Sequence, residues 1–102
     1  MESIEPVYLE IVIDSRELTA ASSSRDDLEE PLEVALAEGK LGVVCGGGSS
    51  SQTVIIEVEV FDGDRLNEAL KIMRRSLLDH RAPSTTVIKQ TEPDRRVFSI
   101  NG

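Results

Sequence analysis

The chain has one cysteine and one histidine. Either residue could take part in catalysis or metal binding only with suitable side chains beside it. Cys45 would be a nucleophile only where a positive field lowers the pKa of its thiol, and no basic residue lies near it in the sequence. Because Cys45 alternates with Leu41 and Val43, we expect it to be a buried apolar residue of a strand. His80 ends a helical stretch and is expected to cap that helix and interact with its dipole. One cysteine and one histidine do not make a zinc site.

Residues 46–51 form the most conspicuous segment, because successive glycine N–H groups can enclose an anion. A phosphate-binding loop also needs Lys followed by Ser or Thr after its last glycine, with a helix behind it. Here serines, a glutamine and then a strand follow. We therefore interpret Gly46, Gly47, Gly48 and Ser49 as a flexible hairpin loop. Mobile loops often carry function, which keeps this segment a candidate.

Acidic pairs are the remaining candidates for chemistry. The sequence Asp62-Gly63-Asp64 matches only the first fragment of a calcium loop, since the twelfth position holds Met73 in place of the closing glutamate. We expect Asp64 to cap a helix, and Asp27 with Glu30 to form a capping pair at the start of another. We predict no catalytic residue, no metal site and no cofactor.

The elements that must position these residues follow from hydrophobic periodicity. Alternation with period two predicts strands, and apolar residues at helical spacing predict helices. Gly39 is placed to end the first helix in a left-handed cap. The stretch 14–27 has no apolar periodicity and is expected to be a loop. The expected strands are residues 7–13, 40–45, 52–61 and 85–91, with a short fifth strand an option at 96–100; the expected helices are 27–38 and 64–80.

This β-α-β-β-α-β order resembles the ferredoxin-like fold. With its glycine-rich turn between the middle strands and Pro83-Ser84-Thr85 before the last strand, the chain looks similar to small uncharacterised bacterial proteins of that fold. The resemblance implies one α+β domain over residues 1–102, with a four-stranded antiparallel sheet and both helices on one face. It assigns no function by itself. Acylphosphatases share the architecture, but their glycine-rich phosphate loop is replaced here by Ser15-Arg16-Glu17-Leu18, which lacks glycine.

The resemblance also implies that strands 7–13 and 52–61 are central neighbours. The sheet face away from the helices would then present Tyr8 near Phe61 and Glu10 near Glu59, with Glu57 beside them. Like charges directly opposite each other are unfavourable, and Lys89 on the last strand is placed to relieve them. We therefore expect an exposed surface of Tyr8, Glu10, Glu57, Glu59 and Phe61.

Composition excludes several classes of function. The net charge of −8 and an aromatic content of 3% argue against nucleic acid as a partner. The apolar runs are far shorter than the roughly 20 residues that cross a bilayer. The first residues lack the positive charge and apolar run of a signal peptide, and a lone cysteine suits a reducing compartment. We expect a cytoplasmic protein without a membrane partner.

Together these observations favour a small acidic protein that is not an enzyme and that acts by protein–protein contact through the open sheet face. The expected partner is a second copy, stacked sheet on sheet as a homodimer, or a basic protein; a face that is only solvated, as one face of an antiparallel sheet commonly is, stays open beside these two. An immunity-type inhibitor that covers the basic active site of a toxin is one form of the latter. The alternative is a small-molecule-binding or catalytic dimeric α+β barrel with a cleft lined by Tyr8, Phe61 and the glycine loop.

Overall fold

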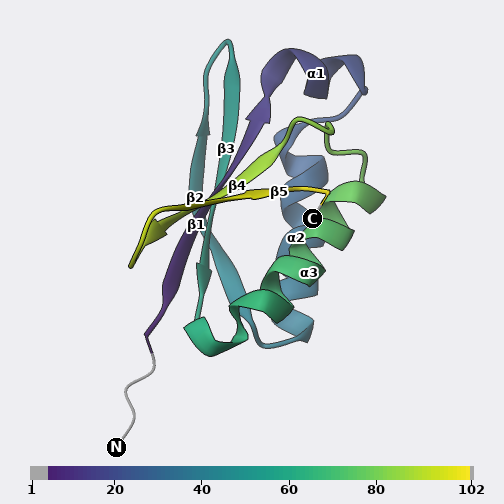
Figure 1. The fold of residues 1–102 in the computed structure, drawn as a ribbon. Helices are drawn as coiled ribbons and strands as arrows, with labels where there is room; N and C mark the ends of the chain where they lie inside the picture. Colours follow the sequence, from purple (N-terminus) through teal and green to yellow (C-terminus); the bar gives the residue numbers. More distant parts are fainter. Residues whose placement is uncertain (1–4, 102) are drawn as a thin grey trace, which may run out of the picture.

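A computed structural model describes residues 5–101 as an α+β fold with a five-stranded antiparallel sheet (Figure 1). Residues 1–4, on which the expectation of no signal peptide depends, and residue 102 lie outside the described residues. None of the helices in the described part is long and apolar enough to cross a membrane. The strands follow the order β2-β3-β1-β4-β5 in the sheet. The elements are β1 (Val7–Asp14), α1 (Ser15–Ala20), α2 (Arg25–Glu38), β2 (Gly42–Ser49), β3 (Thr53–Val60), the 3₁₀ turn η1 (Gly63–Arg65), α3 (Leu66–Asp79), β4 (Val87–Glu92) and β5 (Arg96–Ser99).

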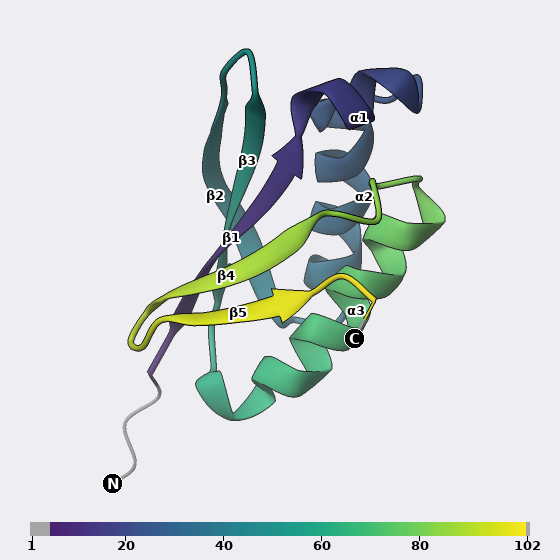
Figure 2. The ribbon, with the colours of Figure 1, turned by 45° about the horizontal axis from the view of Figure 1, so that its top comes forward.

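The core lies between the sheet and the helices, which Figures 1 and 2 show on the same side of the sheet. The period-two pattern of β1 and β3 is confirmed, because alternate residues of both strands are buried. Burial of these side chains is the dominant favourable term in folding. The buried residues are Val7, Leu9, Ile11, Ile13, Val54, Ile56, Val58 and Val60 from the two strands, with Leu28, Leu32, Leu36, Leu70, Met73 and Leu77 from α2 and α3.

Residues 14–27 do not form the expected loop, because they contain α1 and the start of α2. Asp14 caps α1 by accepting hydrogen bonds from the N–H groups of Arg16 and Glu17, at 2.8 and 3.1 Å. The helix has six residues and a single buried one, so it leaves no periodic signal. Helix α2 is capped by Ser24, which forms a capping box with Asp27, so the expected pair of Asp27 with Glu30 is wrong.

Two further helix ends differ from expectation. Gly39 adopts a right-handed conformation (φ −84°), and the left-handed residue is Lys40 (φ 54°). A side chain at Gly39 would place its Cβ 2.9 Å from Cδ1 of Leu41, so close packing explains this glycine. Asp64 is not a cap, because Asp62 accepts its N–H at 2.9 Å within η1, and α3 begins two residues later.

The glycine segment is the largest correction to the predicted strands. Gly46, Gly47, Gly48 and Ser49 belong to β2 and pair with residues of β3, so they are not a loop. The hairpin turn follows at residues 50–52, where the N–H of Ser50 donates to the carbonyl of Thr53 at 2.8 Å. Gly47 allows β2 and β3 to approach each other closely, since a Cβ at this position would lie 2.4 Å from the carbonyl oxygen of Ile55.

Replacing Gly47 with alanine is expected to destabilise the protein, because of this clash and a φ of +157°. We expect the free energy of unfolding to fall by more than about 1 kcal/mol, measured as a lower urea midpoint by circular dichroism. Gly48→Ala is the matched control, because nothing lies within 4 Å of its Cβ position. Its free energy of unfolding should change by less than about 0.5 kcal/mol. Equal midpoints for the two variants would show that β2 and β3 are not held this closely.

Candidate functional site

The open face of the sheet is set by the pairing of β1 with β3 and β4. Tyr8 pairs with Glu59, and Glu10 pairs with Glu57. The expected pairing of Tyr8 with Phe61 and of Glu10 with Glu59 is therefore wrong by two residues. A shift of two leaves every side chain on the same face, so the apolar pattern cannot distinguish the two registers.

Four glutamates surround Tyr8 on this face. Besides Glu10, Glu57 and Glu59, the structure adds Glu92, which pairs with Tyr8 from β4. Sequence analysis missed Glu92 because it precedes Pro93 in a segment with turn chemistry. We call Tyr8, Glu10, Glu57, Glu59 and Glu92 the acidic face.

Neutralisation of the acidic face from within the chain is slight. Lys89 pairs with Glu10 across β1 and β4, as expected. The ion pairs within residues 5–101 are Arg25–Glu29 and Arg65–Glu68, so none joins Lys89 to a glutamate of this face. Glu10 and Glu57 lie directly opposite each other, an arrangement that costs stability. The acidic face therefore retains an unneutralised negative charge.

Cys45 lies on the open face, beside the acidic face, and is exposed. The expectation of a buried cysteine is wrong because Val44, which pairs with Val58, takes the core-facing position. The pairing register shifts between Val44 and Gly46, which makes Cys45 the extra residue of a β-bulge.

A hollow of about 270 Å³ joins Cys45 to Tyr8, Glu10, Glu57 and Glu92. Partial burial of the Cys45 thiol, followed by the charges of Glu57 and Glu59, raises its pKa above the ordinary value. A raised pKa lowers the thiolate fraction near neutral pH, so the surroundings of Cys45 disfavour nucleophilic chemistry.

The large apolar side chains of the open face do not converge on this hollow. Tyr8 is 38% exposed and lines it, whereas Phe61 is 44% exposed, lies one residue beyond β3 and does not. Residues 46–49 do not line it either. Tyr8, Phe61 and the glycines therefore lie on separate parts of the sheet. They do not line one cleft, as the small-molecule alternative requires.

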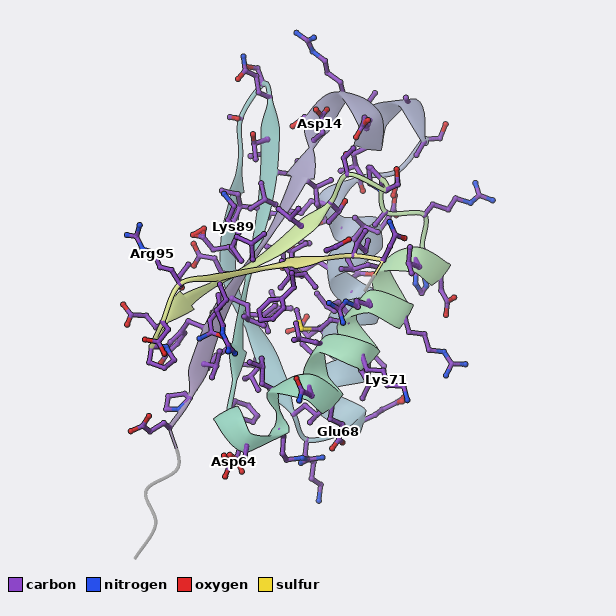
Figure 3. All side chains as sticks on the ribbon, in the orientation of Figure 1. Asp14, Asp64, Glu68, Lys71, Lys89 and Arg95 are labelled. Atoms are coloured by element: carbon purple, nitrogen blue, oxygen red, sulfur yellow. The ribbon has the colours of Figure 1, made fainter. Side chains whose placement is uncertain are left out.

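The β4–β5 side of the same face carries positive charge. Figure 3 shows Lys89 and Arg95 on the side of the sheet that points away from the helices. A second hollow of about 590 Å³ is lined by these two residues together with Glu10, Glu92 and Val97. Val97 is 67% exposed. The open face thus has an acidic part over β1, β3 and the end of β4, and a basic part formed by Lys89 of β4 and by Arg95, which precedes β5.

The other residues singled out from the sequence have structural roles. His80 is the C-cap residue of α3, and its Nδ1 donates to the carbonyl of Ser76 at 2.8 Å. Asp62 caps η1. Among residues 5–101, no group of three or more His, Cys, Asp or Glu side chains is arranged to hold a metal ion.

Alkylation of Cys45 tests the electrostatics of the acidic face. We expect iodoacetamide to react more slowly with Cys45 than with the thiol of a short unstructured peptide at the same pH, because the raised pKa lowers the thiolate fraction. The double variant Glu57→Gln/Glu59→Gln should lower that pKa and speed the reaction. Below the pKa, each unit by which it falls raises the thiolate fraction about tenfold, and the rate rises by a smaller factor because a less basic thiolate is a weaker nucleophile.

Glu33→Gln on the exposed surface of α2 is the control for this measurement, and its profile of rate against pH should match that of the unaltered protein. If all the profiles coincide, the glutamates do not act on the thiol.

Comparisons with protein families, with curated proteins and with solved structures find no match to this chain.

Proposed function

We propose that this protein is a small binding protein whose acidic face contacts a basic surface of a partner protein. The observation that carries the proposal is the set of four glutamates around Tyr8, which no helix of the described residues covers and no ion pair among them neutralises. Cationic side chains of a partner would relieve the repulsion between Glu10 and Glu57. The protein would then gain on binding an interaction that it lacks when free.

The aromatic residues support a contact surface of this kind. Tyr8 and Phe61 both expose large apolar side chains beside the glutamates. Exposed aromatic residues often supply much of the energy of a protein interface, while charge speeds encounter and fixes orientation. An inhibitor of the immunity type, which covers a basic active site with an acidic surface, would use these two features together.

The same proposal includes the finer description of the fold. We infer a ferredoxin-like architecture extended by β5. Its support is that α2 connects β1 with β2, α3 connects β3 with β4, and the first four strands follow the order β2-β3-β1-β4. Such an arrangement leaves one sheet face open, which is where the acidic face lies. The short strand β5 then extends the edge of the sheet beside β4.

A charge-neutral triple variant, Glu10→Gln/Glu57→Gln/Glu59→Gln, tests the acidic face. As a probe we would use a nine-residue peptide of lysine with two tryptophans, titrated into ¹⁵N-labelled protein. The unaltered protein should show shifts centred on Tyr8 and its neighbours, and weaker binding at higher salt. Loss of three charge interactions at this solvent-facing surface should weaken binding roughly tenfold.

The matched control removes the same charge from the helical layer, at Glu17, Glu33 and Glu68, which are exposed on α1, α2 and α3. This variant should keep most of the affinity and the same pattern of shifts. If both triple variants lose affinity equally, the peptide responds to net charge alone and the proposal fails.

A second copy of the chain is the other candidate partner, and the basic part of the open face favours it. Two sheets stacked about a two-fold axis could place Lys89 and Arg95 of one copy over the glutamates of the other. Closed two-fold symmetry is the commonest arrangement of oligomers. The observation in its favour is that both charges lie on one face (Figure 3).

Sedimentation analysis separates the two partners. If the sheets stack, the unaltered protein should sediment as a dimer in low salt, and Lys89→Gln/Arg95→Gln should be a monomer because complementary charges are lost. Lys71→Gln/Arg81→Gln, which changes two exposed cations outside the open face, is the control and should remain dimeric. A monomer in every case excludes the second copy and leaves the foreign basic partner.

A further inference from the structure

The largest of the hollows described for this protein lies between α2 and α3 and is separate from the acidic face. It has a volume of about 650 Å³ and takes its lining from these two helices and from His80. Figures 1 and 2 show the two helices side by side. We call this hollow the helix groove. Sequence analysis did not predict it, because the groove depends on how two helices distant in the sequence pack together.

Helix α2 carries two apolar stripes, and only one of them is needed for the core. Leu28, Leu32 and Leu36 are fully buried against the sheet. Pro31, Val34 and Ala35 line the groove, and Val34 remains 56% exposed. Ile72 of α3, which is partly buried against the core, lines the groove together with this second stripe. The floor of the groove is therefore apolar although it faces solvent, which is a recurrent property of binding grooves.

Acidic side chains border this apolar floor. Asp26, Glu30 and Glu38 line the groove from α2, and Asp79 lines it from α3. Asp27 also lines it but already forms the capping box with Ser24. Arg75 is the cation of the lining, and none of the ion pairs described within residues 5–101 includes it. The groove therefore combines an apolar floor with a net negative border.

We propose that the helix groove binds a basic amphipathic helix of a partner protein. The apolar face of such a helix would cover Val34, Ala35 and Ile72, and its lysines and arginines would meet the carboxylates on either side. Laying an amphipathic helix into an apolar groove is a recurrent mode of peptide recognition. Helix α2 has 14 residues, which at 1.5 Å per residue gives roughly 20 Å of groove, or about four helical turns. The proposal does not depend on the acidic face.

Two synthetic peptides test this proposal. Each has 14 residues, the length of α2, and each contains the same leucines, alanines, lysines and arginines. In one the order segregates apolar and basic residues onto opposite helical faces, and in the other the order is scrambled. We expect the amphipathic peptide to shift amide resonances of α2 and α3 and to bind about tenfold or more tightly than the scrambled peptide, which has equal charge but no apolar face.

Substitution of the groove floor provides the second readout. Val34→Ser should weaken binding of the amphipathic peptide by about three- to tenfold, because a half-exposed valine loses its contact with the peptide. Leu78→Ser is the matched control, since Leu78 is 46% exposed on α3 and does not line the groove. Both residues are exposed, so circular dichroism should show both variants folded. Glu30→Gln/Glu38→Gln should weaken binding mainly at low salt.

Three results would overturn the proposal: equal affinity for the two peptides, equal effects of Val34→Ser and Leu78→Ser, or resonance shifts confined to the acidic face. The variant Glu57→Gln/Glu59→Gln separates this proposal from the proposed function. It should leave binding in the helix groove unchanged, whereas it removes two glutamates of the acidic face. Each surface can therefore fail its own test while the other passes.

Discussion

The fold of this protein depends on β1, which must pair with a strand on each side and also bury one of its faces in the hydrophobic core. It pairs with β3 on one side and β4 on the other. Its alternate residues Leu9, Ile11 and Ile13 are almost fully buried. Because the side chains of a strand alternate, a core on one face commits the intervening residues to the other. Tyr8 is exposed and Glu10 is half-buried on that other face, so the open face is a direct consequence of how the core is built.

The acidic face follows from the same constraint applied to three strands. Glu57 and Glu59 alternate with buried Val58, and Glu92 is brought to Tyr8 by the pairing of β4. No single strand carries the whole set. The pairing of the strands in the sheet therefore brings these negative charges together. A second acidic surface arises independently on the helical layer, where α2 exposes Pro31, Val34 and Ala35 between carboxylates.

Hydrophobic periodicity predicts most of the strands and helices of this fold, but it does not predict the strand register or helix α1. The faces of β1 and β3 are set by parity, so Ile11 and Ile56 could be assigned to the core from sequence. Their register could not, since a shift of two residues preserves parity. Helix α1 was missed because it depends on the cap at Asp14 and on one buried side chain, Leu18.

The candidate site shows the same division. Tyr8, Glu10, Glu57 and Glu59 could be placed on one face from sequence alone. The positions of Cys45 and Glu92 could not be predicted. Cys45 depends on a bulge in β2, and Glu92 depends on a shift in the pairing of β1 with β4 between Tyr8 and Leu9. Irregularities of pairing leave no trace in the hydrophobic pattern, yet they determine which side chains surround Tyr8.

The central position of β1 also affects how the chain folds during synthesis. The Thr91 hydroxyl donates to the carbonyl of Tyr8 across 83 residues of sequence, so β1 and β4 meet in the sheet although they lie far apart in the sequence. While the ribosome is still making β4, β1 can pair with β3 alone and its other edge is open. Unpaired strand edges invite association with other chains, and long-range pairing slows folding. The nascent protein thus holds β1 half paired until β4 has been synthesised.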